Sequence, residues 1–163
     1  MVEWLTTITT GIGLIFIWWQ IREARKTANS QFLLQLHEMF RNYDELNQEL
    51  SQDNRWKPPE GEGKPSWLDV YSYIGLFERV KILADRGQIS FDEINRLYAY
   101  RIYWILRNEH LRIELIKNDG QWKDFIQLCK NIADLKTKNK SSNLDIHFLH
   151  LVDELPMARE RDE

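Results

Sequence analysis

The chain has 163 residues, a formal net charge of −3 and one cysteine. This length is enough for one domain and a short additional segment. The weak negative charge does not favour nonspecific nucleic-acid binding, which requires a strongly basic surface. The single cysteine, Cys129, excludes a disulfide framework and a thiolate metal site within the chain, as expected in a reducing cytoplasm. Its apolar neighbours mark it as a core residue rather than a nucleophile.

The N-terminal region holds the most informative segment. Residues 4–19 contain no charged side chain. The whole stretch 1–21 reaches the ~20 residues that a helix needs to cross a bilayer. Trp4 at one end and Trp18 and Trp19 at the other match the aromatic belts of the two membrane surfaces. We therefore predict a transmembrane anchor over residues 1–21, with the lipid bilayer as partner.

The charges around this segment predict its orientation. Arg22, Arg25 and Lys26 follow the apolar stretch directly. The positive-inside rule then places the N-terminus outside and the remaining chain in the cytoplasm, in a single-pass protein of a bacterial inner membrane. A signal peptide needs basic residues before the apolar run and small residues at its end, whereas Glu3 and Trp19-Gln20 stand there. The uncleaved anchor is favoured over a signal peptide and over a buried helix of a soluble protein.

Small side chains within the anchor predict self-association. Thr7 and Gly11 are four residues apart, and so are Thr9 and Gly13. Because lipid provides no hydrophobic drive for helix pairing, close backbone approach and hydroxyl hydrogen bonds must provide it. These residues therefore favour a homo-oligomer. The alternative is that the threonines bond their own helix backbone and face lipid.

The segment after the anchor predicts a continuous amphipathic helix over residues 22–54. Neither glycine nor proline occurs between Leu14 and Lys57, so the membrane helix is expected to continue into the cytoplasm. Apolar residues recur there at alternating spacings of four and three, at Phe32, Leu36, Met39, Tyr43, Leu46 and Leu50. The stripe is short for a free coiled coil, so we expect it to dock on its own domain.

A proline-rich and glycine-rich loop over residues 55–66 separates this helix from the next. Ser66 followed by Asp69 predicts the start of a helix. Gly75 within that helix suggests close packing against a neighbour. The sequence Arg86-Gly87 predicts its end, since glycine readily adopts the left-handed conformation after a helix.

The remaining pattern is helical as well. Ser90 and Glu93 form a capping box that opens a long helix to about Asn118, apolar on two faces and therefore central. Residues 121–136 predict another helix, and a shorter one ends at Pro156.

No segment shows the alternation of a strand, so the predicted fold is all-α. It consists of the transmembrane helix continuing into a cytoplasmic bundle of about four to five helices. The helical domain covers residues 67–156, and residues 157–163 form a charged tail.

Two charged residues interrupt the most apolar helices. Glu78 and Arg101 are placed on faces that otherwise carry apolar side chains. Because an unpaired buried charge is strongly destabilising, they are predicted to form a buried ion pair. Such a pair is usually structural, and the alternative is a functional pocket beside Tyr98, Tyr100 and Tyr103.

The sequence Arg107-Asn108-Glu109-His110 offers the only catalytic candidates, Arg107 and His110. Ribonucleases of the HEPN type carry an arginine, often followed by asparagine, with a histidine four to six residues later. Here the spacing is shorter, and an ordinary exposed helix surface is favoured. His147 and His150 share a helix face, but two histidines alone are a weak metal signal. We therefore predict no catalytic residues, no metal and no cofactor.

Most of the chain carries a resemblance. It resembles a family of small bacterial single-span helical membrane proteins that share a domain of unknown function, through the order of the anchor, Gln20-Ile21-Arg22 with Ala24-Arg25-Lys26-Thr27, the apolar stretch Phe32 to Phe40 and residues 73–106. Within residues 73–106 the matching motifs are Phe77-Glu78, Arg86-Gly87-Gln88-Ile89-Ser90 and Tyr103-Trp104. That family implies no activity. A weaker similarity connects the chain to membrane-anchored accessory proteins of RNA-targeting CRISPR effectors, which carry a HEPN-like helical domain.

The expected function is that of a self-associating, non-enzymatic membrane scaffold or effector. The alternative is an oligomeric membrane pore or effector in phage defence, with a degenerate HEPN-like domain. An active ribonuclease is less favoured, because the spacing of Arg107 and His110 departs from the HEPN pattern.

Overall fold

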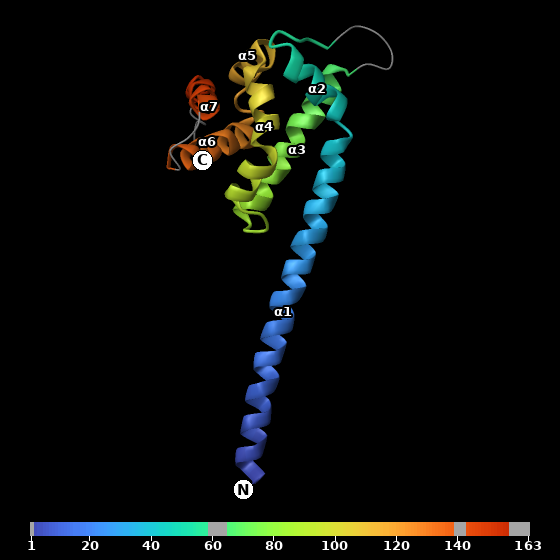
Figure 1. The fold of residues 1–163 in the computed structure, drawn as a ribbon, viewed down its shortest axis with the longest axis vertical. Helices are drawn as coiled ribbons and strands as arrows, with labels where there is room; N and C mark the ends of the chain where they lie inside the picture. Colours follow the sequence, from blue (N-terminus) through green and yellow to red (C-terminus); the bar gives the residue numbers. More distant parts are fainter. Residues whose placement is uncertain (1, 59–64, 139–142, 157–163) are drawn as a thin grey trace. The chain divides into compact units, whose positions relative to one another are not determined.

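Figure 1 shows the fold in a computed structural model, which describes residues 2–58, 65–138 and 143–156. Side chains are described in these ranges except at positions 2–15, 25, 26, 28, 29, 143 and 144. Over the described ranges the chain forms seven helices and no strand, which confirms the all-α class. The chain divides into two compact units, residues 1–39 and residues 40–163.

The first unit lies within one long helix. Helix α1 (Val2–Arg41) is 40 residues long and appears in Figure 1 as the blue to cyan helix. Among the described residues, no helix is both long enough and apolar enough to cross a bilayer. The side chains of residues 2–15, which make up most of the predicted anchor at 1–21, lie outside the described set. The anchor therefore stays a prediction.

The predicted continuous helix over residues 22–54 is wrong, because the chain breaks at Asn42 and Tyr43. Helix α1 ends at Arg41, and α2 (Asp44–Gln52) begins after a turn closed by the Tyr43 N–H donating to the Phe40 carbonyl at 3.0 Å. No glycine or proline marks this turn. The apolar residues on both sides of it are buried in the second unit, namely Phe40, Leu46 and Leu50.

Helix α3 (Trp67–Asp85) begins and ends where the sequence predicts. Ser66 and Asp69 form a reciprocal capping box, and Gly87 has a φ of 68°, in the left-handed region. The expected close packing at Gly75 is wrong, because a Cβ atom built there meets nothing within 4 Å.

The predicted long helix over residues 91–118 is divided as well. Helix α4 (Phe91–Arg107) starts at the predicted capping box of Ser90 and Glu93, and α5 (Glu109–Lys117) follows after Asn108. Asn108 has a ψ of 118°, which is extended rather than helical. The predicted bundle of four to five helices therefore contains six helices after α1 over the described residues.

Helices α4 and α6 lie at the centre of the second unit. Helix α6 (Lys123–Lys138) packs against α3, α4 and α7 (Asn143–Asp153), and α4 contacts α2, α5, α6 and α7. The central position predicted for the helix that begins after Ser90 is confirmed. Aromatic side chains fill much of the core, including Phe40, Tyr73, Phe77, Phe125 and Phe148.

Candidate functional site

A girdle of exposed apolar side chains surrounds α1 at residues 16–21. Their exposed fractions are 55 % for Phe16, 52 % for Ile17, 61 % for Trp18, 55 % for Trp19 and 50 % for Ile21. Because an α-helix turns about 100° per residue, this stretch covers the whole circumference. Apolar side chains therefore project from every side of this stretch, and Gln20 is the one polar side chain within it.

The C-terminal edge of the girdle carries the predicted positive flank. The Arg22 guanidinium lies over the Trp18 ring, 5.7 Å from its centroid. A cation beside an amphipathic indole is typical of the boundary between lipid and water. Of the predicted belt, the structure describes the side chains of Trp18 and Trp19, which are exposed, and their place at a membrane surface stays a prediction.

The other residues predicted for the anchor lie outside the described side chains. These are Trp4 of the belt, Thr7, Thr9, Gly11 and Gly13 of the packing face, and Arg25 and Lys26 of the positive flank. Their predicted roles stay predictions.

Within the second unit, Arg101 on α4 is the centre of a polar cluster. Its side chain is 7 % exposed and forms an ion pair with Asp44 at the start of α2. Its Nε donates to the Tyr100 hydroxyl at 2.9 Å, and its Nη1 donates to the Tyr73 hydroxyl at 3.4 Å and the Phe40 carbonyl at 3.5 Å. Each guanidinium nitrogen therefore has a protein acceptor.

The surroundings of Arg101 stabilise its charge. Burial alone lowers the pKa of Arg101, but the hydrogen bonds to Asp44 and Tyr73 outweigh it and raise the pKa above its ordinary value. Burial also raises the pKa of Tyr73, whose hydroxyl donates to Asn47 at 3.2 Å. The contacts of this cluster join α2, α3 and α4. Because Arg101 and Tyr73 both keep their protons at neutral pH, the cluster is not suited to proton transfer.

The predicted ion pair between Glu78 and Arg101 is wrong, because Asp44 takes the place of Glu78. Glu78 on α3 is half-buried beside the N-terminal end of α6. Burial and the negative charge of Asp124 raise the pKa of Glu78, while a hydrogen bond with the Phe125 backbone lowers it. The sequence places charge on both helices but does not show that the turn after α1 brings Asp44 to Arg101.

The catalytic candidates Arg107 and His110 lie on different helices, at the end of α4 and the start of α5. The Arg107 guanidinium lies over the Trp104 ring, 5.2 Å from its centroid. Asn108 between the two helices is fully buried. Its side chain donates to the Trp56 carbonyl at 3.0 Å and accepts from the Leu111 N–H at 3.0 Å. The asparagine of this motif therefore has a structural role, because it caps α5 and bonds the backbone at Trp56.

The remaining titratable candidates, a cysteine and two histidines, are either buried in the core or lie beside a polar side chain. Cys129 is fully buried, and burial raises the pKa of its thiol well above the ordinary value. His147 Nδ1 lies 3.2 Å from the Tyr103 hydroxyl, and His150 lies 3.6 Å from a carboxylate oxygen of Glu154. Among the described residues, no group of three or more histidine, cysteine or acidic side chains is arranged to hold a metal ion.

Described residues of the second unit line at least two pockets. The larger, about 470 Å³, lies between α6 and α7, and Lys130 in its lining donates to the Pro156 carbonyl at 2.7 Å. The smaller, about 200 Å³, lies among α4, α6 and α7, and its lining includes Asn95, Arg96 and Lys136. The sequence suggested a functional pocket at Glu78 and Arg101, beside Tyr98, Tyr100 and Tyr103. Of these residues Tyr100 and Tyr103 line the smaller pocket, and the sequence gave no signal for Asn95, Arg96 or Lys136 in its lining.

No protein-family model, curated protein or solved structure matches the chain. The resemblances to the single-span helical family and to CRISPR accessory proteins therefore have no support from these comparisons, and they stay predictions.

Proposed function

We propose that the chain is a single-pass membrane protein whose N-terminal helix anchors a cytoplasmic helical domain. The observation that carries this proposal is the apolar girdle at residues 16–21 of α1. It extends the uncharged stretch that begins at Trp4 and stops at Arg22. A helix that is apolar on every side belongs in a protein core or a bilayer.

The energetics favour the bilayer as the environment of this stretch. Full burial of one large apolar side chain contributes about 1.5–3 kcal/mol. Five such side chains, at least half exposed in water, therefore represent a large unfavourable surface. Tryptophans at the end of the stretch and the following basic residues support an orientation with the helical domain in the cytoplasm.

We further propose that the protein self-associates through its anchor and acts as a non-enzymatic scaffold or effector. The spacing of Thr7 with Gly11, and of Thr9 with Gly13, supports helix pairing. In the helical domain Arg101 is fully used in joining helices, and Arg107 and His110 make no hydrogen bond to each other. These contacts support a structural role for the polar residues.

Extraction and particle mass test both parts of this proposal. The wild type is expected to stay in the membrane pellet after a carbonate wash. Replacing Gly11 and Gly13 with leucine blocks close approach and leaves the segment at least as apolar, so the variant should stay in the membrane but form a smaller particle in detergent. Release of the wild type by carbonate would contradict the anchor. An unchanged particle mass would contradict assembly through these glycines.

A further inference from the structure

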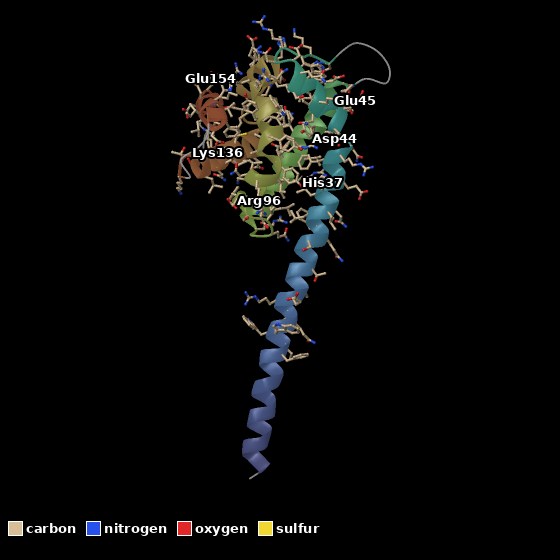
Figure 2. All side chains as sticks on the ribbon, viewed as in Figure 1. His37, Asp44, Glu45, Arg96, Lys136 and Glu154 are labelled. Carbon is tan, nitrogen blue, oxygen red and sulfur yellow. The ribbon has the colours of Figure 1, made fainter. Side chains whose placement is uncertain are left out.

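The pocket among α4, α6 and α7 has the composition of a ligand site. Its volume is about 200 Å³, and its lining includes Asn95, Arg96, Tyr100, Tyr103, Lys136 and Phe148. Most of its lining lies on α4, at positions three to four residues apart that share one helix face. Figure 2 labels Arg96 and Lys136, its two cationic side chains.

One polar atom of the lining is left without a partner. The Asn95 side-chain oxygen is buried and accepts no hydrogen bond from any described residue. A buried acceptor without a donor destabilises the folded protein by about 1–3 kcal/mol. An N–H or O–H group of a ligand in the pocket would supply the missing donor. Asn95 therefore indicates that the ligand carries a hydrogen-bond donor.

The charges of the lining favour an anion. Lys136 is 15 % exposed, forms an ion pair with Asp145, and lies over the Phe148 ring, 5.5 Å from its centroid. Arg96 is exposed, and its positive charge acts on the Glu93 carboxylate three residues earlier on α4. The lining itself holds two cations and one carboxylate, and an exposed guanidinium suits a carboxylate or phosphate.

The walls favour a flat ring of limited size. Tyr100, Tyr103 and Phe148 contribute aromatic surface, and Tyr100 is 48 % exposed. Aromatic faces and edges attract other rings in stacked or perpendicular arrangements. The volume is below the ~300–1,000 Å³ of sites for drug-sized ligands. A single ring with one acidic substituent matches this space.

We propose that this pocket binds a small organic acid built on one flat ring. The ring lies against Tyr100, Tyr103 and Phe148, the acid group is bound by Arg96 with Lys136 nearby, and a donor on the ligand bonds the Asn95 oxygen. A benzene carboxylate and a pyrimidine carboxylate share this chemistry. The assignment does not rest on the membrane anchor, since every residue lies in the second unit.

Calorimetric titration of the full-length protein in detergent tests the site. The probes are 4-hydroxybenzoate, orotate and inorganic phosphate. We expect one of the two ring-bearing acids to bind with a Kd below about 1 mM and phosphate alone to bind at least tenfold more weakly. The stronger ring-bearing probe identifies the source of the acid. The proposal is overturned if neither ring-bearing probe binds or if phosphate binds equally well.

Two variants separate a ligand site from a structural cluster. Arg96→Gln should weaken binding of that probe about tenfold, because it removes a charge-assisted hydrogen bond. Asn95→Leu should also weaken binding but leave the free energy of unfolding unchanged or higher, because it removes an unsatisfied acceptor. Arg79→Gln, on the exposed surface of α3, is the matched control and should bind as the wild type does. Wild-type affinity in both pocket variants would overturn the assignment.

Discussion

Asp44 and Arg101 are 57 residues apart in the sequence, and their ion pair joins α2 to α4. Arg101 is almost fully buried, whereas 55 % of the Asp44 side chain is exposed. A pair of this kind is asymmetric, because the arginine has lost its water and depends on protein acceptors. Removing the exposed partner therefore leaves a buried charge with one acceptor fewer.

We expect Asp44→Asn to lower the free energy of unfolding by about 1–2 kcal/mol. The loss stays below the ~3–5 kcal/mol of a fully buried pair because water reaches Asp44. Glu45→Gln is the matched control, since Glu45 is also an exposed acidic residue in the first turn of α2, but the ion pair with Arg101 is formed by Asp44. It should change stability by at most about 0.5 kcal/mol. Denaturant unfolding measures both, and equal effects would contradict the role of Asp44.

At the scale of elements, the sequence predicts helix starts and ends far better than helix breaks. Ser66, Ser90 and Gly87 act through bonds to residues a few positions away, so their signals are local and correct. The turn at Asn42-Tyr43 is accompanied by contacts with distant segments, because Tyr43 stacks on Tyr73 and the Phe40 carbonyl accepts from Arg101. At the break between α4 and α5, Asn108 donates to the Trp56 carbonyl. No local pattern contains those contacts, and both breaks were therefore missed.

Asn108 rather than Arg107 or His110 should be the sensitive position of its motif. Asn108→Ala removes the cap of α5 and leaves the buried Trp56 carbonyl without its donor, so we expect a loss of about 2–3 kcal/mol. His110→Ala should cost at most about 0.5 kcal/mol. Arg107→Ala loses only the contact with Trp104, worth about 0.5–1 kcal/mol. Thermal unfolding ranks the three variants.

The same variants test the ribonuclease alternative. We expect the purified wild type to show no metal-independent RNA cleavage that Arg107→Ala or His110→Ala could abolish. General acid–base catalysis contributes about 10²–10⁴-fold, so loss of a true catalytic group would be unmistakable. Cleavage by the wild type that disappears in both variants would contradict a non-enzymatic protein.

The candidate sites also differ in whether a run of neighbouring residues or the packing of distant segments creates them. The girdle could be predicted from the sequence, because five apolar residues within positions 16–21 are visible as a run. The pocket could not, because Asn95 and Arg96 on α4 meet Lys136 on α6 only after the helices pack. The pairing of Arg101 with Asp44 could not be predicted either, because it depends on the turn after α1 that brings Asp44 to Arg101.

The two units of the chain differ in how they treat apolar side chains. The second unit buries most of its phenylalanines in its own core, including Phe77, Phe125 and Phe148, whereas α1 leaves apolar residues exposed at its girdle. Anchoring α1 in a bilayer would cover that girdle and hold the small pocket in the cytoplasm. Both the proposed anchoring and the proposed location of the helical domain therefore depend on insertion of α1 into the membrane.

A topology reporter fused after Glu163 tests this insertion and its orientation, because it shows on which side of the membrane the helical domain lies. We expect a cytoplasmic signal from the membrane fraction for the wild type. Leu14→Arg should release the protein from the membrane, because a charge near the middle of the span costs about 2.5–3.5 kcal/mol. Leu34→Arg is the matched control, since Leu34 lies on the same helix beyond the span and is 70 % exposed. A periplasmic signal, or release of the wild type and both variants alike, would contradict the account.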